Sequence, residues 1–276
     1  MSTPSNTPQT LAFIGGGNMA SAIIGGLIKQ GTPPDRIVVV EPFADARTRL
    51  NSQFGVRTLA TADDNLAQAG LVIWAVKPQT FKEAAQQTRD FCANALHLSV
   101  AAGIRSDSIA NWLGTQRVVR AMPNTPALVG LGQTGLFART AVTPQDKAWI
   151  EQVIATTGAL LWVKDESLLD AVTAISGSGP AYVFFFIEAM VEAGVKMGLT
   201  PEQATQLAIG TFEGASLLAK TATEPPSVLR ERVTSKGGTT YAALTSMQNA
   251  RVGELFQVAL QAAQQRAHEL GDEFGA

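Results

Sequence analysis

The sequence predicts an α/β protein, with a doubly wound, mostly parallel sheet in an N-terminal domain and an all-helical C-terminal domain. Three observations lead to this prediction. Short runs rich in Val, Ile and Leu alternate with helical stretches between residues 10 and 164, a glycine-rich turn follows the first run, and the strand pattern stops after about residue 165. We therefore expect one domain over residues 1–164, with residues 1–9 as a disordered lead-in, and a second over residues 165–276.

The apolar runs of the first domain have the character of buried parallel strands. Most of them do not alternate with polar residues, as expected where helices cover both faces of a sheet. Strand–helix–strand repeats of this kind are typical of doubly wound folds. The expected strands are 11–15, 36–41, 71–76, 96–102, 117–122, 135–140 and 159–163, and the expected helices between them are 19–31, 45–54, 79–91 and 144–157.

The first strand leads into the stretch FIGGGNMASAIIGGL, which contains a G-x-G-x-x-A pattern. Gly15 permits a tight turn, Gly17 lets the backbone approach a pyrophosphate, and the small Ala20 allows helix and strand to pack closely. The helix that begins here adds unpaired N–H groups and the positive end of its dipole. In this strand–turn–helix context the pattern predicts a Rossmann-type dinucleotide site, which also includes Gly16, Asn18 and Met19.

The end of the second strand bears on the choice between NAD and NADP. Glu41 lies there, and an acidic residue at this point usually accepts hydrogen bonds from the ribose hydroxyls of NAD. Arg47 and Arg49 follow on the next helix, where they could meet a 2′-phosphate or simply form a solvated face. These residues leave both NAD and NADP open as the cofactor.

Three later strands end in segments that could reach the cofactor. Ligands of open α/β sheets bind at the carboxyl ends of the strands, where this sequence has WAVKPQ, VAAG and RAMPNTPAL. A Lys-Pro pair after a strand is by itself more often a turn. The prediction of a cofactor site therefore depends on all three segments lying at the same edge of the sheet. The residues expected to line the cofactor there are Ala75, Val76, Lys77, Pro78, Ala102, Gly103 and Asn124.

Strong helix signals mark the second domain. Thr200 is placed as an N-cap, with Gln203 three residues on to complete a capping box. The preceding run AYVFFFIEAMVEAGVKMGL is long and apolar, but it carries Glu188, Glu192 and Lys196 on one helical face. A membrane span should lack that polar stripe, so we expect a helix buried in a core or covered by another subunit.

Composition excludes several classes of function. The formal charge is −2, from 21 basic and 23 acidic side chains, so no basic excess favours nucleic acid. A single cysteine, Cys92, excludes a disulfide within the chain, and two histidines, His97 and His268, exclude a histidine-rich metal site. The polar N-terminus lacks the basic and apolar regions of a signal peptide. We therefore expect a cytoplasmic protein with no metal and no membrane segment.

Two glycine-rich segments lie in the second domain. A small-residue loop, Ser176 to Gly179, precedes Pro180 at the start of the long helix, which could be no more than a well-capped helix start. Farther on, Gly237 to Thr240 would expose backbone N–H groups at another helix start, an arrangement that binds carboxylates and phosphates. A Gly-Gly C-cap followed by a threonine N-cap is the alternative for this second segment.

Together these segments resemble the pyrroline-5-carboxylate reductase family, over nearly the whole chain beyond the first nine residues. The shared motifs are FIGGGNMASAIIGGL, AVKPQ, RAMPNTPA, DAVTAISGSGPAYVFFFIEAM and SKGGTTYAAL, in the family's order and spacing. The last two are specific to that family rather than to nucleotide-binding proteins in general. The resemblance implies reduction of a cyclic imine to L-proline with NADPH or NADH as hydride donor.

The resemblance also implies roles for matching residues. The Gly15–Ala20 turn would hold the pyrophosphate, and the loops from Ala75 to Asn124 would line the nicotinamide side. In the family the substrate loop comes from a partner subunit of an interlocked helical homodimer, and dimers often build into decamers. The implied substrate-binding residues are Ser178, Gly179, Pro180, Ser235, Gly238, Thr239 and Thr240, with the Thr240 hydroxyl as the catalytic candidate that hydrogen-bonds the ring nitrogen.

Two positions depart from the family pattern. Many relatives have proline where this chain has Lys236, so an extra positive charge flanks the anion site. The family commonly prefers NADPH, whereas Glu41 favours NADH.

The reaction itself fits the residues present. A ketone reduced by hydride needs a positioned acid, whereas a cyclic imine can be protonated before the hydride arrives. Positioning then supplies much of the rate, a task that suits threonine and glycine. Candidate acids are nevertheless present, namely Lys77, Lys236, Tyr182 and Tyr241.

Two alternatives differ from this reading. A β-hydroxyacid dehydrogenase would share the architecture, but it needs a lysine within the helix after its glycine-rich loop, and the first lysine of that helix here is Lys196, about four turns in. A non-catalytic nucleotide-binding sensor would have kept the fold alone, which the intact SGSGPAY and GGTT segments count against.

Overall fold

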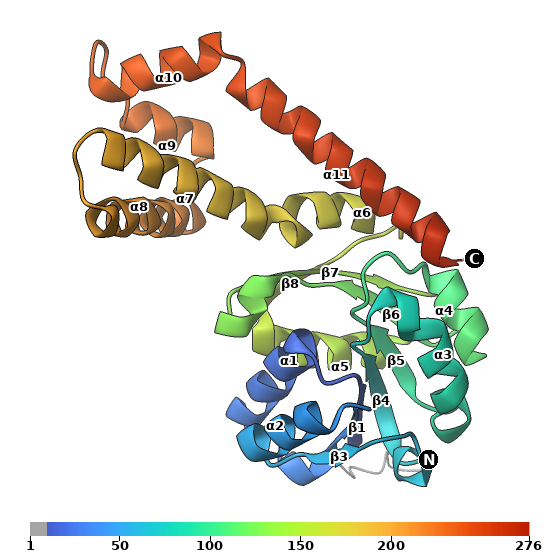
Figure 1. Cartoon of the computed structure of the whole chain (residues 1–276). Coiled ribbons are helices and arrows are strands. Elements are labelled where there is room, and N and C mark those ends of the chain that lie inside the picture. The colour runs from blue at the N-terminus through green and yellow to red at the C-terminus, as the bar shows by residue number, and fades with distance from the viewer. Residues whose placement is uncertain (1–9, 276) are drawn as a thin grey trace. The chain divides into compact units, whose positions relative to one another are not determined.

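The structure, a computed structural model, describes residues 10–275 (Figure 1), so the expected disordered lead-in lies outside the described residues. The chain divides into two compact units. Unit 1 comprises the residues up to Ser178 together with those from Ala263 onward, and unit 2 comprises Gly179–Ala262. This division differs from the expected boundary after residue 164, because the segment up to Ser178 and the last turns of the chain pack with the sheet.

Unit 1 is built on a single sheet of eight strands within the described residues, in the order β3-β2-β1-β4-β5-β6-β7-β8. Neighbouring strands run parallel except for β6 and β7, which confirms the expected mostly parallel sheet. The strands are β1 (Thr10–Ile14), β2 (Ile37–Val40), β3 (Arg57–Leu59), β4 (Ala69–Trp74), β5 (Leu96–Ser99), β6 (Val118–Met122), β7 (Gly132–Ala138) and β8 (Gly158–Trp162).

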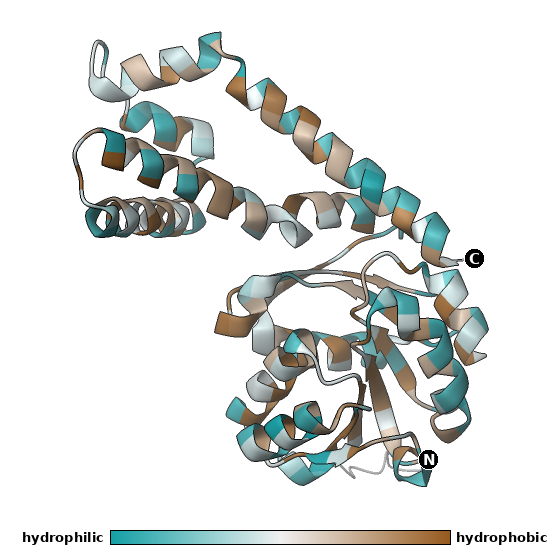
Figure 2. Cartoon of the chain, viewed as in Figure 1, coloured by the Kyte–Doolittle hydropathy of each residue, from teal (hydrophilic) through white to brown (hydrophobic). Residues whose placement is uncertain are grey.

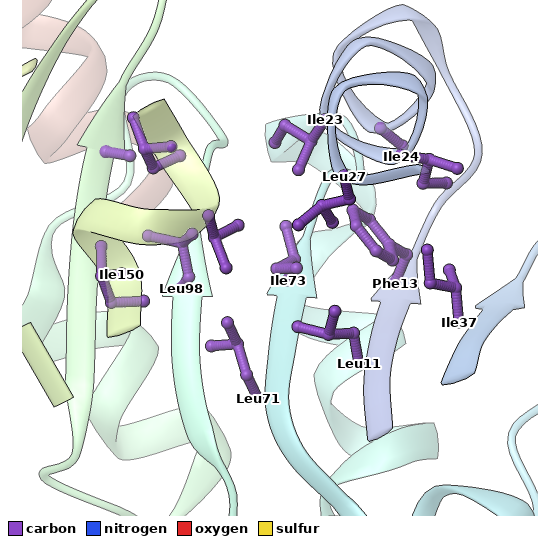
Figure 3. Close-up of a cluster of buried hydrophobic side chains, with 14 of the residues drawn as sticks. Leu11, Phe13, Ile23, Ile24, Leu27, Ile37, Leu71, Ile73, Leu98 and Ile150 are labelled. Atoms are coloured by element: carbon purple, nitrogen blue, oxygen red, sulfur yellow. The ribbon is translucent and has the colours of Figure 1, made fainter. Parts of the chain in front are cut away.

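Helices cover both faces of this sheet (Figure 1), because the strand residues alternate between two apolar clusters. Leu11 and Phe13 of β1 face one side, and Ala12 and Ile14 face the other. On the first side Ile23, Ile24 and Leu27 of α1 pack over Phe13 (Figure 3). The helices of unit 1 are α1 (Asn18–Lys29), α2 (Ala44–Phe54), α3 (Pro78–Thr88), α4 (Ser106–Leu113), α5 (Pro144–Ile154), α6 (Leu168–Val172) and the end of α11 (Val252–Gly275).

Two elements of unit 1 were not expected from the sequence. The strand β3 has three residues, RTL, too short to show a strand pattern. The helix α4 reads SDSIANWL, and its serines, aspartate and asparagine weaken the helix signal. Both form because tertiary packing overrides local propensity: β3 pairs with β2, and Ile109 and Leu113 of α4 are buried on the sheet.

The histidine of β5 is part of the core. His97 is buried, and its Nδ1 accepts a hydrogen bond of 3.0 Å from Trp74 Nε1. Burial lowers the pKa of His97 to about 4, so the ring is neutral at physiological pH. Burial likewise raises the pKa of the Cys92 thiol to about 11. These two residues therefore pack the sheet rather than bind a ligand.

Unit 2 is helical throughout, as expected. The predicted capping box at Thr200 forms: its Oγ1 accepts from Gln203 N, and the Gln203 side chain accepts from Thr200 N. The helices are α7 (Gly179–Lys196), α8 (Pro201–Thr221), α9 (Pro226–Arg232), α10 (Thr239–Asn249) and the first part of α11.

Large apolar side chains of unit 2 remain exposed, among them Phe184, Phe185, Leu218 and Leu255. Hydrophobic residues recur along the helices of this unit (Figure 2). The run Leu168–Lys196 is long and apolar enough to cross a membrane by composition, and only 6% of its apolar window is buried within the chain. An exposed apolar surface of this kind marks an interaction site. The polar stripe of α7 still favours a protein partner over lipid as the cover.

Candidate functional site

The glycine-rich turn of unit 1 has the geometry of a pyrophosphate cradle. Gly15 adopts φ +94°, and a Cβ there would lie 2.6 Å from Ala75 O, so only glycine fits. Gly17 is the N-cap of α1, and a Cβ on it would meet no atom within 4 Å among the described residues. Because no side chain within residues 10–275 caps α1 and its first turn has no acidic residue, the N–H groups there are available to an anion.

The side chain of Glu41 contacts the backbone of the glycine turn. Its buried carboxylate accepts hydrogen bonds from Gly16 N at 2.8 Å and from Phe43 N at 3.0 Å. Arg47 Nη1 donates to the carbonyl oxygens of Glu41 and Pro42, at 2.8 and 2.7 Å. Glu41 therefore holds the backbone of the turn, and Arg47 holds the segment that follows β2, while their contact with the cofactor stays a prediction.

The next strand ends at the same edge of the sheet. A Cβ on Gly15 would also approach Val76 Cγ1 at 3.0 Å, so the segment from Ala75 to Pro78 borders the turn directly. Val100 N donates to Trp74 O at 3.0 Å, which places the segment after β5, with Ala102 and Gly103, alongside. The chain reverses its strand order between β1 and β4, where doubly wound sheets bind ligands.

Asn124 connects this edge to the SGSGP segment. Its side-chain Nδ2 donates to Ser176 O at 3.0 Å, and its Oδ1 accepts from Gln133 N at 2.8 Å. The buried amide of Asn124 thus links the start of β7 to the segment before α7 through hydrogen bonds to the backbone. A role in lining the cofactor site stays a prediction.

The small-residue loop expected over Ser176 to Gly179 is wrong in its form. Residues Thr173–Gly177 make a π-helical turn, in which Ser178 N donates to Thr173 O at 2.8 Å, and α7 begins at Gly179. A Cβ on Gly177 would lie 2.5 Å from Met122 Cε, so Gly177 packs closely against the end of that side chain. Single π turns of this kind are frequent at functional sites.

A group of charged residues around the start of α4 was not predicted from the sequence. Arg105 makes a two-pronged ion pair with Asp170, both N–O distances being 2.9 Å, and this hydrogen-bonded carboxylate raises the pKa of Arg105. Glu166 accepts from Ser106 N and Oγ, each at 2.6 Å, and pairs with buried Arg120. The available signal was the acidic segment DESLLDA after the last strand, which supplies both Glu166 and Asp170.

In unit 2 the GGTT segment forms an exposed turn before α10. Gly237 adopts φ +76°, and Gly238 is the N-cap of a helix that begins at Thr239. The alternative reading is therefore wrong: α9 ends at Arg232, and no threonine caps α10. Among the described residues no side chain makes a capping hydrogen bond to this N-terminus, and the first turn has no acidic residue. Free N–H groups and hydroxyls at this turn suit a carboxylate.

No group of three or more His, Cys, Asp or Glu side chains within residues 10–275 could hold a metal ion. The donors that converge at the described sites are backbone N–H groups and hydroxyls, which bind anions and polar organic ligands rather than metals.

The chain matches known families in both of its parts. Residues 166–270 match the model described as pyrroline-5-carboxylate reductase dimerisation, and residues 10–103 match the model of NADP oxidoreductases, coenzyme F420-dependent. A pyrroline-5-carboxylate reductase of Pseudomonas aeruginosa is 42% identical to it, over 98% of this chain and 99% of that protein.

Solved structures give the same result. A pyrroline-5-carboxylate reductase of Coxiella burnetii has a TM-score of 0.89 at 39% identity, covering 95% of this chain and 98% of that one. A pyrroline carboxylate reductase of Plasmodium falciparum with NADP bound has a TM-score of 0.84 at 26% identity, with the same coverage. The alternative of a β-hydroxyacid dehydrogenase is thereby set aside. With such identity over almost the full length of its relatives, this chain belongs to the pyrroline-5-carboxylate reductase family.

Proposed function

We propose how the residues of this chain carry out the reaction of its family. The reaction is the reduction of 1-pyrroline-5-carboxylate to L-proline, in which the bound nicotinamide cofactor supplies a hydride to the carbon of the C=N bond. The observation that carries the residue assignment is the presence of two uncapped helix N-termini that follow glycine turns, one before α1 and one before α10.

Unit 1 is assigned to the dinucleotide. The turn from Gly15 to Ala20 receives the pyrophosphate on the N–H groups of α1, with Gly17 leaving room for the phosphate oxygens. The segments after β4, β5 and β6, which border this turn along the sheet, line the nicotinamide. These segments exclude water and fix the nicotinamide ring, on which the direction of hydride transfer depends.

Unit 2 is assigned to the substrate carboxylate. The turn at Gly238 exposes the N–H groups of Thr239 and Thr240 in the first turn of α10, and Lys236 adds a nearby positive charge. The Thr240 hydroxyl, which makes no hydrogen bond among the described residues, is assigned to the ring nitrogen. Ser178, Gly179 and Pro180 border the substrate ring, and Ser235 fixes the loop by accepting from Gly238 N. The imine nitrogen carries its own proton, so the residues position rather than protonate.

A homodimer is the proposed working form, alone or within a larger assembly such as a decamer. The family model that matches residues 166–270 is one of dimerisation, and the apolar side chains of α7, α8 and α11 are exposed in the single chain. A second copy of this surface would remove those side chains from water. The cytoplasm is the proposed location, where the reduced cofactor is available.

Initial rates of the wild-type protein test this function. We expect oxidation of NADH or NADPH with 1-pyrroline-5-carboxylate, and slower turnover of its six-membered homologue, in a preparation that elutes above the 29.0 kDa of one chain in size-exclusion chromatography. Tight nucleotide binding without turnover would favour the sensor instead. An active monomer would contradict a site shared between subunits.

The Glu41→Ser variant tests the nucleotide assignment. Removing the carboxylate removes both ribose hydrogen bonds and repulsion of a 2′-phosphate, so the ratio of kcat/KM for NADPH over NADH should rise about tenfold or more. The values of kcat/KM with NADPH and with NADH should each fall below those of the wild type, because Gly16 N loses its acceptor. The control is Glu41→Gln, which keeps an acceptor without the charge. An unchanged ratio in both variants would mean that Glu41 does not contact the ribose.

A further inference from the structure

The side chain of Arg105 joins three segments of unit 1. It follows β5 and its loop, Val100–Ile104, as the N-cap residue of α4. Its guanidinium donates twice to Asp170 of α6, at 2.9 Å, and its Nη2 lies 2.9 Å from His268 Nδ1 of α11. Both partners are far away in sequence, so this one side chain fixes the end of the loop against two other elements.

The guanidinium fits against Gly271 on α11. A Cβ at that position would lie 2.3 Å from Arg105 Nε and 2.6 Å from its Cζ. The absence of a side chain at residue 271 therefore makes the space in which the guanidinium lies. A single methyl group there would force Arg105 away from its present position.

The same turns of α11 also touch the loop itself. Gly103 adopts φ +74°, and a Cβ on it would lie 3.1 Å from Leu270 Cβ and 3.2 Å from Phe274 Cδ2. Ser108 Oγ donates to Gly275 O at 3.0 Å. The loop after β5 is thus held between the sheet on one side and the end of α11 on the other, with Arg105 as the polar link.

We propose that Arg105 is a positioning residue for the cofactor: paired with Asp170 and seated against Gly271, it holds the loop that presents Ala102 and Gly103 to the nicotinamide. This inference rests on the proposed function, which places that loop at the cofactor. Arg105 itself touches neither reacting atom. Its effect is on the geometry of the loop, and therefore on binding of the nucleotide rather than of the imine.

The Gly271→Ala variant tests the proposal without removing a charge, and Gly253→Ala is its matched control. Both substitutions lie in α11 and replace glycine by the better helix former, but a Cβ at Gly253 meets no atom within 4 Å among the described residues. We expect Gly271→Ala to raise the nucleotide dissociation constant and KM about three- to tenfold, as for a residue acting through a neighbouring loop, with KM for the imine nearly unchanged. Gly253→Ala should match the wild type.

A second variant, Arg105→Lys, keeps the charge but loses the two-pronged contact, and it should give an intermediate nucleotide KM with an unchanged imine KM. A wild-type nucleotide dissociation constant in both Gly271→Ala and Arg105→Lys would overturn the proposal, even if the melting temperature fell. Equal rises in both KM values would also overturn it. Failure of the wild type to bind nucleotide at all would instead refute the proposed function.

Discussion

The Thr240→Ala variant is expected to lower kcat/KM for 1-pyrroline-5-carboxylate about 100-fold, the usual effect of removing one preorganised hydrogen-bonding group from the transition state. Nucleotide affinity should stay nearly unchanged, because Thr240 belongs to unit 2 and the dinucleotide site is assigned to unit 1. Stability should also stay unchanged, since the hydroxyl makes no hydrogen bond among the described residues. Steady-state kinetics with saturating nucleotide, and a fluorescence titration of the nucleotide, measure the two effects separately.

Two controls make this result specific. Thr240→Ser keeps the hydroxyl and should recover most of the activity. Thr245→Ala removes a threonine of the same helix whose Oγ1 already donates to Tyr241 O, and it should leave kcat/KM near the wild-type value. Equal losses of activity and nucleotide affinity in Thr240→Ala would remove Thr240 from the substrate site.

The Gly17→Ala variant is expected to weaken nucleotide binding about 30-fold, or ~2 kcal/mol, because its methyl group would occupy the space of the pyrophosphate. The free protein has room for that methyl and an ordinary φ of −75° at the position, so its melting temperature should barely change. Titration with the nucleotide and thermal unfolding without it give the two quantities.

The neighbouring variant Gly15→Ala provides the contrast. There φ is +94° and the added Cβ would lie 2.6 Å from Ala75 O, so the turn must distort even without ligand. We expect Gly15→Ala to lower both nucleotide affinity and melting temperature. Wild-type nucleotide affinity in Gly17→Ala would place the pyrophosphate elsewhere.

Much of the fold could be predicted because its signals are local. The apolar runs of β1, β2 and β4, and the glycine turn before α1, each lie within a few consecutive residues. The helices of unit 2 carry equally local signals, such as the capping box at Thr200. Periodicity and caps depend on neighbours in sequence, which is why these elements were found.

Other features depend on contacts between distant residues, and no local pattern encodes them. Arg105 and Asp170 are 65 positions apart, and their pairing follows from how α4 and α6 meet on the sheet. Within the π turn at Thr173–Gly177, Ser176 O accepts a hydrogen bond from Asn124, which lies 52 positions away at another strand end. The three-residue strand β3 forms only because β2 offers it an edge.

The position of Glu41 beneath the glycine turn constrains how cofactor preference could evolve or be engineered. Its carboxylate supports the Gly16 amide, and the same carboxylate is the group assigned to the ribose. A change that removes the acceptor together with the charge, such as Glu41→Ser, leaves the buried Gly16 N–H without a partner, at a cost of about 1–3 kcal/mol. A productive route to NADPH use must therefore begin with a neutral acceptor of similar reach, and only afterwards add positive charge for the 2′-phosphate.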